Sequence, residues 1–492
     1  MGNQVPNLPV ELISRILENV SSKTTLKNAT LCSRQWYDIA IPHLYCQIDV
    51  GEGHQDEGVV RSLTILFLRN AKLAAHVRHF SIRPAFDDGP VEQKTPEDSV
   101  EAILAQKADL EDEIKAAVKV ASQSDEEHAK WLELMGTEDE DCLLALLLPR
   151  FTNLETLDLE IPISPNYIDR MLWRVGRGEQ PFDNEPTFAR LNSIAWFHID
   201  SKYGGSLPAG CFTLPSARAI YLHRMGSSDG DDPDKKLSQI EHGTSGCTHL
   251  EMHDCRLNDP DIKNIITVPK KLSTFIYEIG WGHLSYCSVN FQPLRDALEA
   301  HQSCLEDLWL DYSHDGIEWL DDMDGVSSMA SFKHFSNLKR LRIAPDFIFG
   351  GNLSLEEQGE ESRQKLLLEF LPLNVETLHI THGDQYEEML YKALEHLLTN
   401  KESCLPDLRK LTFETSLAKV EKDRGDRLAA ILQLAEKVGL PVTLLNNWGD
   451  AKYSNYDSRV ERKWGMDEDI EWKPCGSYCN ERPVYEIIDL QH

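Results

Sequence analysis

The sequence predicts an α/β fold in which a short N-terminal module of three helices is followed by a long repeat solenoid. Two patterns predict this order. Apolar residues recur at helical spacing between Asn7 and Tyr45. A six-residue figure, apolar at its first, fourth and sixth positions, then recurs ten times between Val77 and Phe413. Helical patterns fill the intervals, so we expect a parallel concave sheet with helices on the convex side.

The N-terminal module should begin with a helix at Leu8-Pro9, because proline lacks an amide hydrogen and its φ suits the first helical position. The next apolar residues are spaced three and four apart, as on one face of a helix: Leu12, Ile13, Ile16 and Leu17. A second helix can carry Leu26, and a third can carry Trp36 before Pro42 ends it. Helices this few bury too little surface to be stable alone, so we expect part of their apolar face to meet a partner.

This module resembles an F-box over about the first tenth of the chain. The matching positions are Leu8, Pro9, Glu11, Ile16, Leu17, Leu26, Cys32, Trp36, Leu44 and Tyr45. F-box modules dock on the small Skp-type adaptor of cullin-RING (SCF) ubiquitin ligases, and the resemblance implies the same here. The implied adaptor-binding residues are Leu8, Pro9, Ile16, Leu17, Leu26 and Trp36, the last packing the third helix. The alternative is an ordinary helical cap whose apolar residues face its own solenoid.

Composition and charge limit the possible partners. The chain of 492 residues has 50 Lys and Arg against 81 Asp and Glu, and its net charge of −31 would repel nucleic acid. Its longest apolar run, Leu143 to Leu148, is too short for a membrane span. The eleven cysteines are irregularly spaced, and no apolar leader follows Met1. We therefore expect an intracellular protein of the cytoplasm, the nucleus or both, with reduced thiols and no membrane contact.

The repeated figure predicts one strand per repeat. Its ten copies begin at Val77, Leu154, Leu191, Ala217, Cys247, Leu272, Leu305, Leu338, Val375 and Leu408. From the second copy onward the steps are 25 to 37 residues, close to the period of leucine-rich repeats. The whole layout resembles the F-box proteins with degenerate leucine-rich repeats of filamentous fungi. The alternative is a doubly wound α/β sheet, whose strands would be more continuously apolar.

The helices between these strands show their own signals. They are expected at Val59–Leu73, from Asp259-Pro260 with Asp259 as N-cap, and at Leu294–Ala300, Arg363–Leu371, Glu387–Leu398 and Arg427–Val438. The step from Val77 to Leu154 is twice the usual one, and the excess is acidic. It predicts a solvated helical excursion with a disordered acidic end, either at Ser122–His128 or at Gly136–Asp141.

Five segments follow from these patterns. They are an F-box at 1–50, a linker helix and first repeat at 51–84, an acidic helical insertion at 85–147, the solenoid at 148–445, and an aromatic C-terminal cap or tail at 446–492. A cap that covers the last apolar face of the solenoid is the plainer interpretation of the final segment. A docking tail for a partner is the alternative.

No catalytic motif, cofactor site or metal site is expected. The sequence has no Walker loop, dinucleotide turn, zincin helix or nucleophile elbow. The densest set of metal-ligating residues is Cys247, His249, His253 and Cys255. The repeat register directs these cysteines inward and the histidines outward, so the four cannot share one tetrahedral ion.

The outward positions of each repeat are its third, fifth and seventh, because strand side chains alternate between the two faces of a sheet. From them we select a substrate-binding set on the concave face: Phe197, Tyr221, His249, His253, Trp309, Arg340 and Arg342. Trp309 is the first choice, since exposed tryptophan and arginine dominate binding energy. The alternative is that a loop or the C-terminal tail covers Trp309.

Together these features predict the substrate-recognition subunit of an SCF-type ubiquitin ligase. The F-box would hold the Skp-type adaptor and through it cullin, and the repeats would bind a protein substrate that the sequence does not identify. Such a subunit is not an enzyme and acts through proximity. The alternative is a leucine-rich-repeat scaffold whose F-box works outside a ubiquitin ligase.

Overall fold

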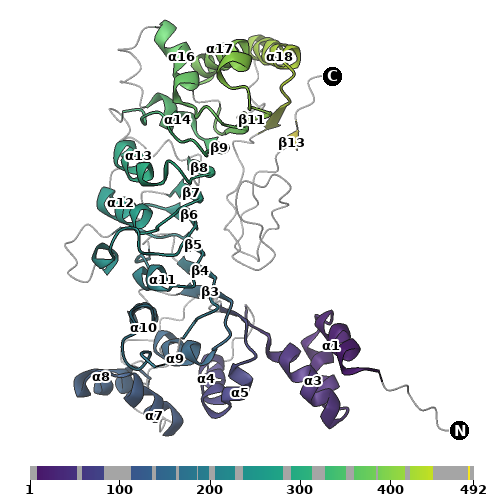
Figure 1. The fold of residues 1–492 in the computed structure, drawn as a ribbon, viewed down its shortest axis with the longest axis vertical. Coiled ribbons are helices and arrows are strands. Elements are labelled where there is room, and N and C mark those ends of the chain that lie inside the picture. The colour runs from purple at the N-terminus through teal and green to yellow at the C-terminus, as the bar shows by residue number, and fades with distance from the viewer. Residues whose placement is uncertain are drawn as a thin grey trace, which may run out of the picture. The chain divides into compact units, whose positions relative to one another are not determined.

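The computed structural model describes residues 8–51, 58–82, 112–135, 140–161, 166–184, 187–198, 205–227, 236–280, 290–312, 327–350, 360–383, 386–415, 422–446 and 486–487. They belong to two compact units. The first consists of Met1–Ile194 with Thr213–Ala217, and the second of Ala195–Phe212 with Arg218–His492. Figure 1 labels elements of both units.

The first unit begins with three short helices, α1 (Val10–Glu18), α2 (Lys23–Thr30) and α3 (Arg34–Tyr45). They enclose a small core made of Ile13, Leu17, Leu26 and Ala40. Serine hydroxyls cap two of them: Ser22 accepts from the Thr25 amide and Ser33 from the Trp36 amide. Pro9 is the N-cap of α1 and not its first residue. Pro42, expected to end the third helix, lies inside α3, which continues one turn to Tyr45.

Three parallel strands of the first unit follow each other in chain order: β1 (Gln47–Val50), β2 (His79–Ile82) and β3 (Thr156–Ile161). The register aligns Ile48, Phe80 and Leu157. The sequence reading missed β1, although Tyr45-x-x-Ile48-x-Val50 repeats the apolar figure. Tyr45 also fits the end of the F-box pattern, so the sequence alone does not single out this strand.

The helices of the first unit are α4 (Val59–Arg69), α5 (Ala71–Ala74), α7 (Asp112–Ala121), α8 (Asp125–Met135), α9 (Glu140–Leu147) and α10 (Asn166–Arg177), with a 3-10 turn at Leu148–Arg150. The single helix expected at Val59–Leu73 is broken at Asn70 into α4 and α5. Ridges of apolar side chains bring α9 against both α4 and α10.

The expectation of a solvated acidic excursion was wrong for the described part of the insertion. Helix α7 buries Ile114 and Val118, and α8 buries Trp131 and Met135, because both helices pack through an apolar stripe. The Asp141 carboxylate at the start of α9 accepts from the amides of Tyr167 and Ile168 at 2.8 and 2.9 Å. At least one acidic residue of the insertion therefore caps a neighbouring helix. Ser122–His128 includes the start of α8, whereas 136–139 lies outside the described residues.

The second unit is also built on parallel strands. Its strands also follow chain order: β4 (Ser193–His198), β5 (Ala219–His223), β6 (His249–Cys255), β7 (Thr274–Ile279), β8 (Asp307–Tyr312), β9 (Arg340–Ile343), β10 (Thr377–Ile380), β11 (Lys410–Thr415) and β12 (Val442–Asn446). A short antiparallel strand, β13 (Glu486–Ile487), pairs with the end of β12. All ten copies of the repeated apolar figure fall on strands, β2 to β11, which confirms the α/β repeat fold.

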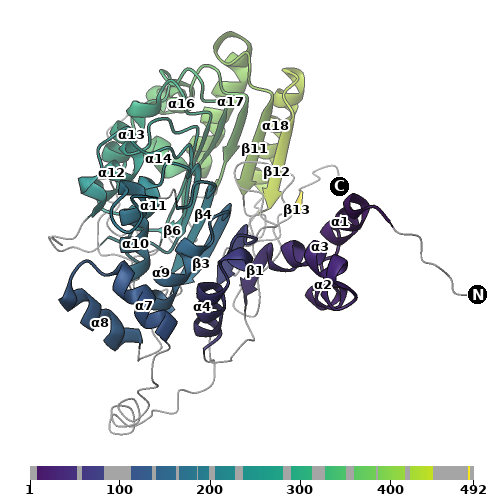
Figure 2. The same ribbon diagram turned by 60° about the horizontal axis from the view of Figure 1, so that its bottom comes forward.

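Helices cover one side of these strands, as Figures 1 and 2 show. They are α11 (Ala209–Thr213), α12 (Asp259–Thr267), α13 (Phe291–Leu298), α14 (Pro345–Phe349), α16 (Glu360–Phe370), α17 (Glu387–Cys404) and α18 (Lys422–Lys437), with 3-10 turns at Lys236–Gln239 and Glu299–His301. The N-cap of α12 is Asn258, whose side chain accepts from the Asp261 amide, and not Asp259 as expected. Apart from Asn446 and β13, the predicted cap or tail at 446–492 lies outside the described residues.

The core of the second unit is a stack of the repeated apolar positions. Parallel pairing aligns the fourth position of six consecutive repeats, and none of these side chains is more than 1% exposed. They are Leu250, Phe275, Leu308, Leu341, Leu378 and Leu411. Fully burying such a side chain contributes about 1.5–3 kcal/mol, so the register is held by many equal contributions.

Because each repeat contributes to one continuous core, a cavity in its middle should weaken the whole unit. We predict that Leu308→Ala lowers the free energy of unfolding by about 2–5 kcal/mol. Leu373→Ala, at an apolar side chain that is 53% exposed, is the matched control and should change it by less than about 0.5 kcal/mol. Urea unfolding followed by circular dichroism measures both. Equal effects of the two substitutions would show that Leu308 is not a core residue.

Candidate functional site

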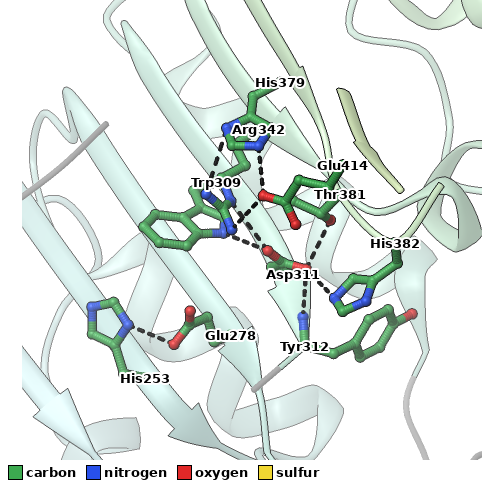
Figure 3. Close-up of polar contacts among 10 residues, drawn as sticks. All are labelled: His253, Glu278, Trp309, Asp311, Tyr312, Arg342, His379, Thr381, His382 and Glu414. Carbon is green, nitrogen blue, oxygen red and sulfur yellow. Dashed lines mark hydrogen bonds and ion pairs between the residues drawn. The ribbon is translucent and has the colours of Figure 1, made fainter. Parts of the chain in front are cut away.

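The outward positions of β6 to β11 carry a connected set of charged and aromatic side chains. We call this set the polar face and define it as Glu251, His253, Glu278, Trp309, Asp311, Arg342, His379 and Glu414. Figure 3 shows its members except Glu251, together with their neighbours Tyr312, Thr381 and His382. All lie in the second unit. The register places Trp309 between Ile276 and Arg342 on the adjacent strands, which brings distant parts of the sequence together.

Trp309 lies at the centre of the polar face. The guanidinium carbon of Arg342 lies 4.2 Å from the centroid of its ring, a cation–π contact, and its indole N–H donates to Asp311 Oδ2 at 3.1 Å. The ring of His253 meets it edge-on, with 6.0 Å between centroids. Trp309 is only 3% exposed. The expectation of an open tryptophan was therefore wrong, because ionic and aromatic neighbours surround its ring.

Asp311 collects the hydrogen bonds around Trp309. Besides the indole it accepts from Arg342 Nε at 3.2 Å, His382 Nε2 at 3.1 Å, Thr381 Oγ1 at 2.9 Å and the Tyr312 amide at 3.0 Å. Burial alone would raise its pKa. The hydrogen bond from His382 and the charge of Arg342 outweigh burial and hold the pKa of Asp311 far below its usual range. Asp311 is thus ionised and fully coordinated by donors.

Arg342 links Asp311 to Glu414 on β11. Its Nη2 lies 3.2 Å from Glu414 Oε1, which also accepts from His379 Nε2 at 2.6 Å. Burial lowers the pKa of His379, and the nearby guanidinium lowers it further. A neutral ring that donates from Nε2 leaves Nδ1 as the acceptor that faces Arg342 Nη1 at 3.5 Å. His379 therefore fits here as a neutral bridge between Arg342 and Glu414.

His253 lies between two carboxylates at the other end of the polar face. Its Nε2 is 2.8 Å from Glu251 and its Nδ1 is 2.7 Å from Glu278. Ionised carboxylates only accept, so both ring nitrogens must donate and the imidazole is cationic. Burial lowers the pKa of His253, but the two carboxylates outweigh burial and raise it overall. Glu251 is also 2.5 Å from His249, and its own pKa is lowered despite burial.

The remaining members of the predicted substrate-binding set lie around the polar face. Phe197 and Tyr221 pack together and are only 4% and 8% exposed. Tyr221 also contacts the ring of His249, with 5.4 Å between centroids. These two aromatics are therefore not open, contrary to expectation, because they pack on each other and on neighbouring histidine rings. Arg340 differs: its side chain is 44% exposed while it donates to the carboxylate of Asp307.

The sequence reading selected aromatic and cationic residues and omitted acidic ones. Glu251, Glu278, His379 and Glu414 occupy the same fifth and seventh positions that identified Trp309 and His253. The register rule would have found all four. His382 has no such signal, because it follows its strand in a left-handed conformation with φ of 46°.

Cys247 and Cys255 point into the core, as the register predicted. Both are fully buried. Burial raises the pKa of the Cys247 thiol to about 12, and it also raises the pKa of the Cys255 thiol. The nearby histidines face the opposite side, where His253 contacts Glu251 and Glu278. Across the segments that the structure describes, no three metal-ligating side chains are placed to hold an ion.

The predicted adaptor-binding residues divide into two groups. Leu8, Pro9 and Ile16 are exposed, whereas Leu17 and Leu26 are only 4% and 3% exposed and form the core of the three helices. Trp36 is half-buried and packs on that core. Leu17, Leu26 and Trp36 thus hold the helices together, and the first group supplies the accessible surface.

The raised pKa of His253 predicts a pH-dependent contribution to stability. A group whose pKa is higher in the folded state than in the unfolded state stabilises the fold. This stabilisation is complete at pH values below the unfolded-state pKa and is lost as the pH rises through the folded-state pKa. We predict that the stability of the wild type relative to His253→Gln decreases from about pH 6.5 upward. Urea midpoints at several pH values measure it, with His334→Gln at an exposed histidine as the control. A difference that is constant with pH would contradict a cationic His253.

The comparisons agree with this architecture. A family model for the leucine-rich repeat domain matches residues 94–414, a range that begins after the three N-terminal helices. No curated protein matches the chain. Within the described residues, no helix combines the length and the apolar character needed to cross a membrane. The match extends over more than half of the chain and its strands carry the repeated apolar figure, so the protein belongs to the leucine-rich repeat domain family.

Proposed function

We propose that this protein is the substrate-recognition subunit of an SCF-type ubiquitin ligase. Leucine-rich repeat domains are interaction modules, and membership of this family indicates a protein-interaction role. In the proposal, the three N-terminal helices dock on a Skp-type adaptor, which connects them to cullin. The second unit binds a protein substrate, and ubiquitin transfer is catalysed by other subunits of the ligase. The chain itself contributes proximity and no catalytic group.

The observation that supports adaptor docking most strongly is the two-sided character of α1. Ile13 and Leu17 face the small core. Leu12 and Ile16, four residues apart, are 47% and 52% exposed, and Leu8 just before the helix is 42% exposed. Side chains four residues apart lie on one side of a helix, so these apolar groups form one stripe. Exposed apolar stripes of this kind mark partner surfaces, typically a helix docking into an apolar groove.

The substrate would approach the second unit through the accessible side chains of the predicted set. Arg340 and His249 are the most open of them, with side chains 44% and 22% exposed. Both are held by carboxylates, Asp307 and Glu251, which fixes their orientation before a partner arrives. Preorganised side chains lose less entropy on binding. The less exposed members would pack behind this surface and hold it in place. They are Phe197, Tyr221, His253, Trp309 and Arg342.

Charge placed on the exposed stripe should abolish docking without unfolding the helices. We predict that Leu12→Glu/Ile16→Glu lowers adaptor recovery in affinity purification by at least about tenfold, since each lost apolar contact is worth about 1.5–3 kcal/mol. Val120→Glu, at an apolar side chain of α7 that is 62% exposed, is the matched control and should leave recovery unchanged. Circular dichroism checks that both variants fold.

The outcome of this experiment separates the candidate functions. Equal adaptor recovery from wild type and double variant would contradict docking through α1. Recovery of the adaptor without cullin would instead favour the alternative, an interaction scaffold that works outside a ubiquitin ligase.

A further inference from the structure

Asp346 is a buried acid outside the polar face. It lies on α14 and is 3% exposed. The titratable groups that face it come from three other elements. Asp311 and Tyr312 lie at the end of β8, His382 follows β10, and Tyr386 immediately precedes α17. None of these is a lysine or arginine that could neutralise an ionised Asp346.

The phenol of Tyr386 makes two short contacts. Its oxygen is 2.9 Å from Asp346 Oδ1 and 2.8 Å from the carbonyl oxygen of Gly350, the residue that ends α14. A carbonyl oxygen only accepts, and so does an ionised carboxylate. The phenol has one hydrogen, which can satisfy one of these contacts. The other contact needs a second hydrogen, and the Asp346 carboxyl is the group that can supply it.

We propose that Asp346 is held as a neutral carboxylic acid and that its proton controls a latch between α14 and α17. In the closed latch, Asp346 donates from Oδ1 to the Tyr386 oxygen, and Tyr386 donates to the Gly350 carbonyl. Both contacts are then hydrogen bonds. Tyr386, the N-cap of α17, is thereby tied to Gly350, the C-cap of α14, across two consecutive repeats of the second unit.

Loss of the proton changes the hydrogen-bond pattern. An ionised carboxylate is the stronger acceptor, so the Tyr386 hydrogen turns to Asp346 and leaves the Gly350 carbonyl. The latch then opens at the Gly350 end. Burial raises the pKa of Asp346 to about 6, which places this change near neutral pH. Among the residues that the structure describes, Asp346 Oδ2 is buried and accepts no hydrogen bond, so none at this oxygen stabilises the charge.

The latch is adjacent to the polar face. The ring of Tyr312 stacks on Phe347 of α14, with 5.5 Å between centroids, and the Tyr312 amide donates to Asp311. His382, which donates to Asp311, also lies close enough to Asp346 to influence its charge. Opening the latch therefore changes the packing of the residues that donate hydrogen bonds to Asp311.

Infrared difference spectroscopy tests the proposal directly. We expect the wild type at about pH 5 to show a protonated-carboxyl band that Asp346→Asn lacks and that disappears by about pH 8. In Tyr386→Phe the same band should persist to higher pH, because the lost hydrogen bond normally lowers the pKa of Asp346. A wild type without any band that depends on Asp346 would overturn the proposal, and so would an unchanged titration in Tyr386→Phe.

Unfolding gives a second, independent readout. The asparagine amide of Asp346→Asn can donate to Tyr386 at every pH, so it imitates the neutral acid. Because the pKa of Asp346 is raised in the folded state, its contribution to stability is complete below the unfolded-state pKa and is lost as the pH rises. The urea midpoint of the wild type should therefore fall relative to this variant between about pH 4 and about pH 7. Asp407→Asn, at an exposed aspartate, is the control. A wild type that follows Asp346→Asn over this range would refute the latch.

Discussion

The parallel register of the strands is the constraint from which the other features of the second unit follow. Each repeat places its first, fourth and sixth residues in the core, and pairing aligns them from strand to strand. The third, fifth and seventh residues must then meet on the opposite side of the sheet. Residues as distant in sequence as Glu251 and Glu414 thus come to belong to one polar face. The apolar pattern that builds the core also positions the charged groups.

Charged groups that lie together with little exposure to water must be paired with groups of opposite charge or with hydrogen-bond partners. Around Arg342 the carboxylates are more deeply buried than their partners: the side chains of Asp311 and Glu414 are 3% and 2% exposed. Their cationic and imidazole partners are more accessible, with 17% for Arg342 and 14% for His379. A chain with a net charge of −31 therefore does not expose these acids on this face. The more accessible groups there are the guanidinium of Arg342 and the imidazole of His379.

The strands could be predicted because ten copies of the same apolar figure support one another. The prediction of a strand failed where one residue fits two different patterns. Tyr45 concealed β1, and Gly439 stands where β12 needs an apolar first position. The exposure of Trp309 could not be predicted either, because it depends on Arg342 and His253, which reach the ring only through tertiary packing. Because only aromatic and cationic residues were selected from the outward positions, the acidic residues that complete the site were left out.

The central claim is that the polar face is one charge-compensated layer in which Asp311 and Arg342 depend on each other. A double-mutant cycle with Asp311→Asn and Arg342→Gln, measured by urea unfolding, tests it most directly. The account predicts a coupling energy above about 1 kcal/mol, because either single substitution removes one partner of the ion pair and leaves the other charge, at low exposure, with only its remaining contacts, Glu414 for Arg342 and His382 for Asp311. Additive effects within about 0.5 kcal/mol would contradict it.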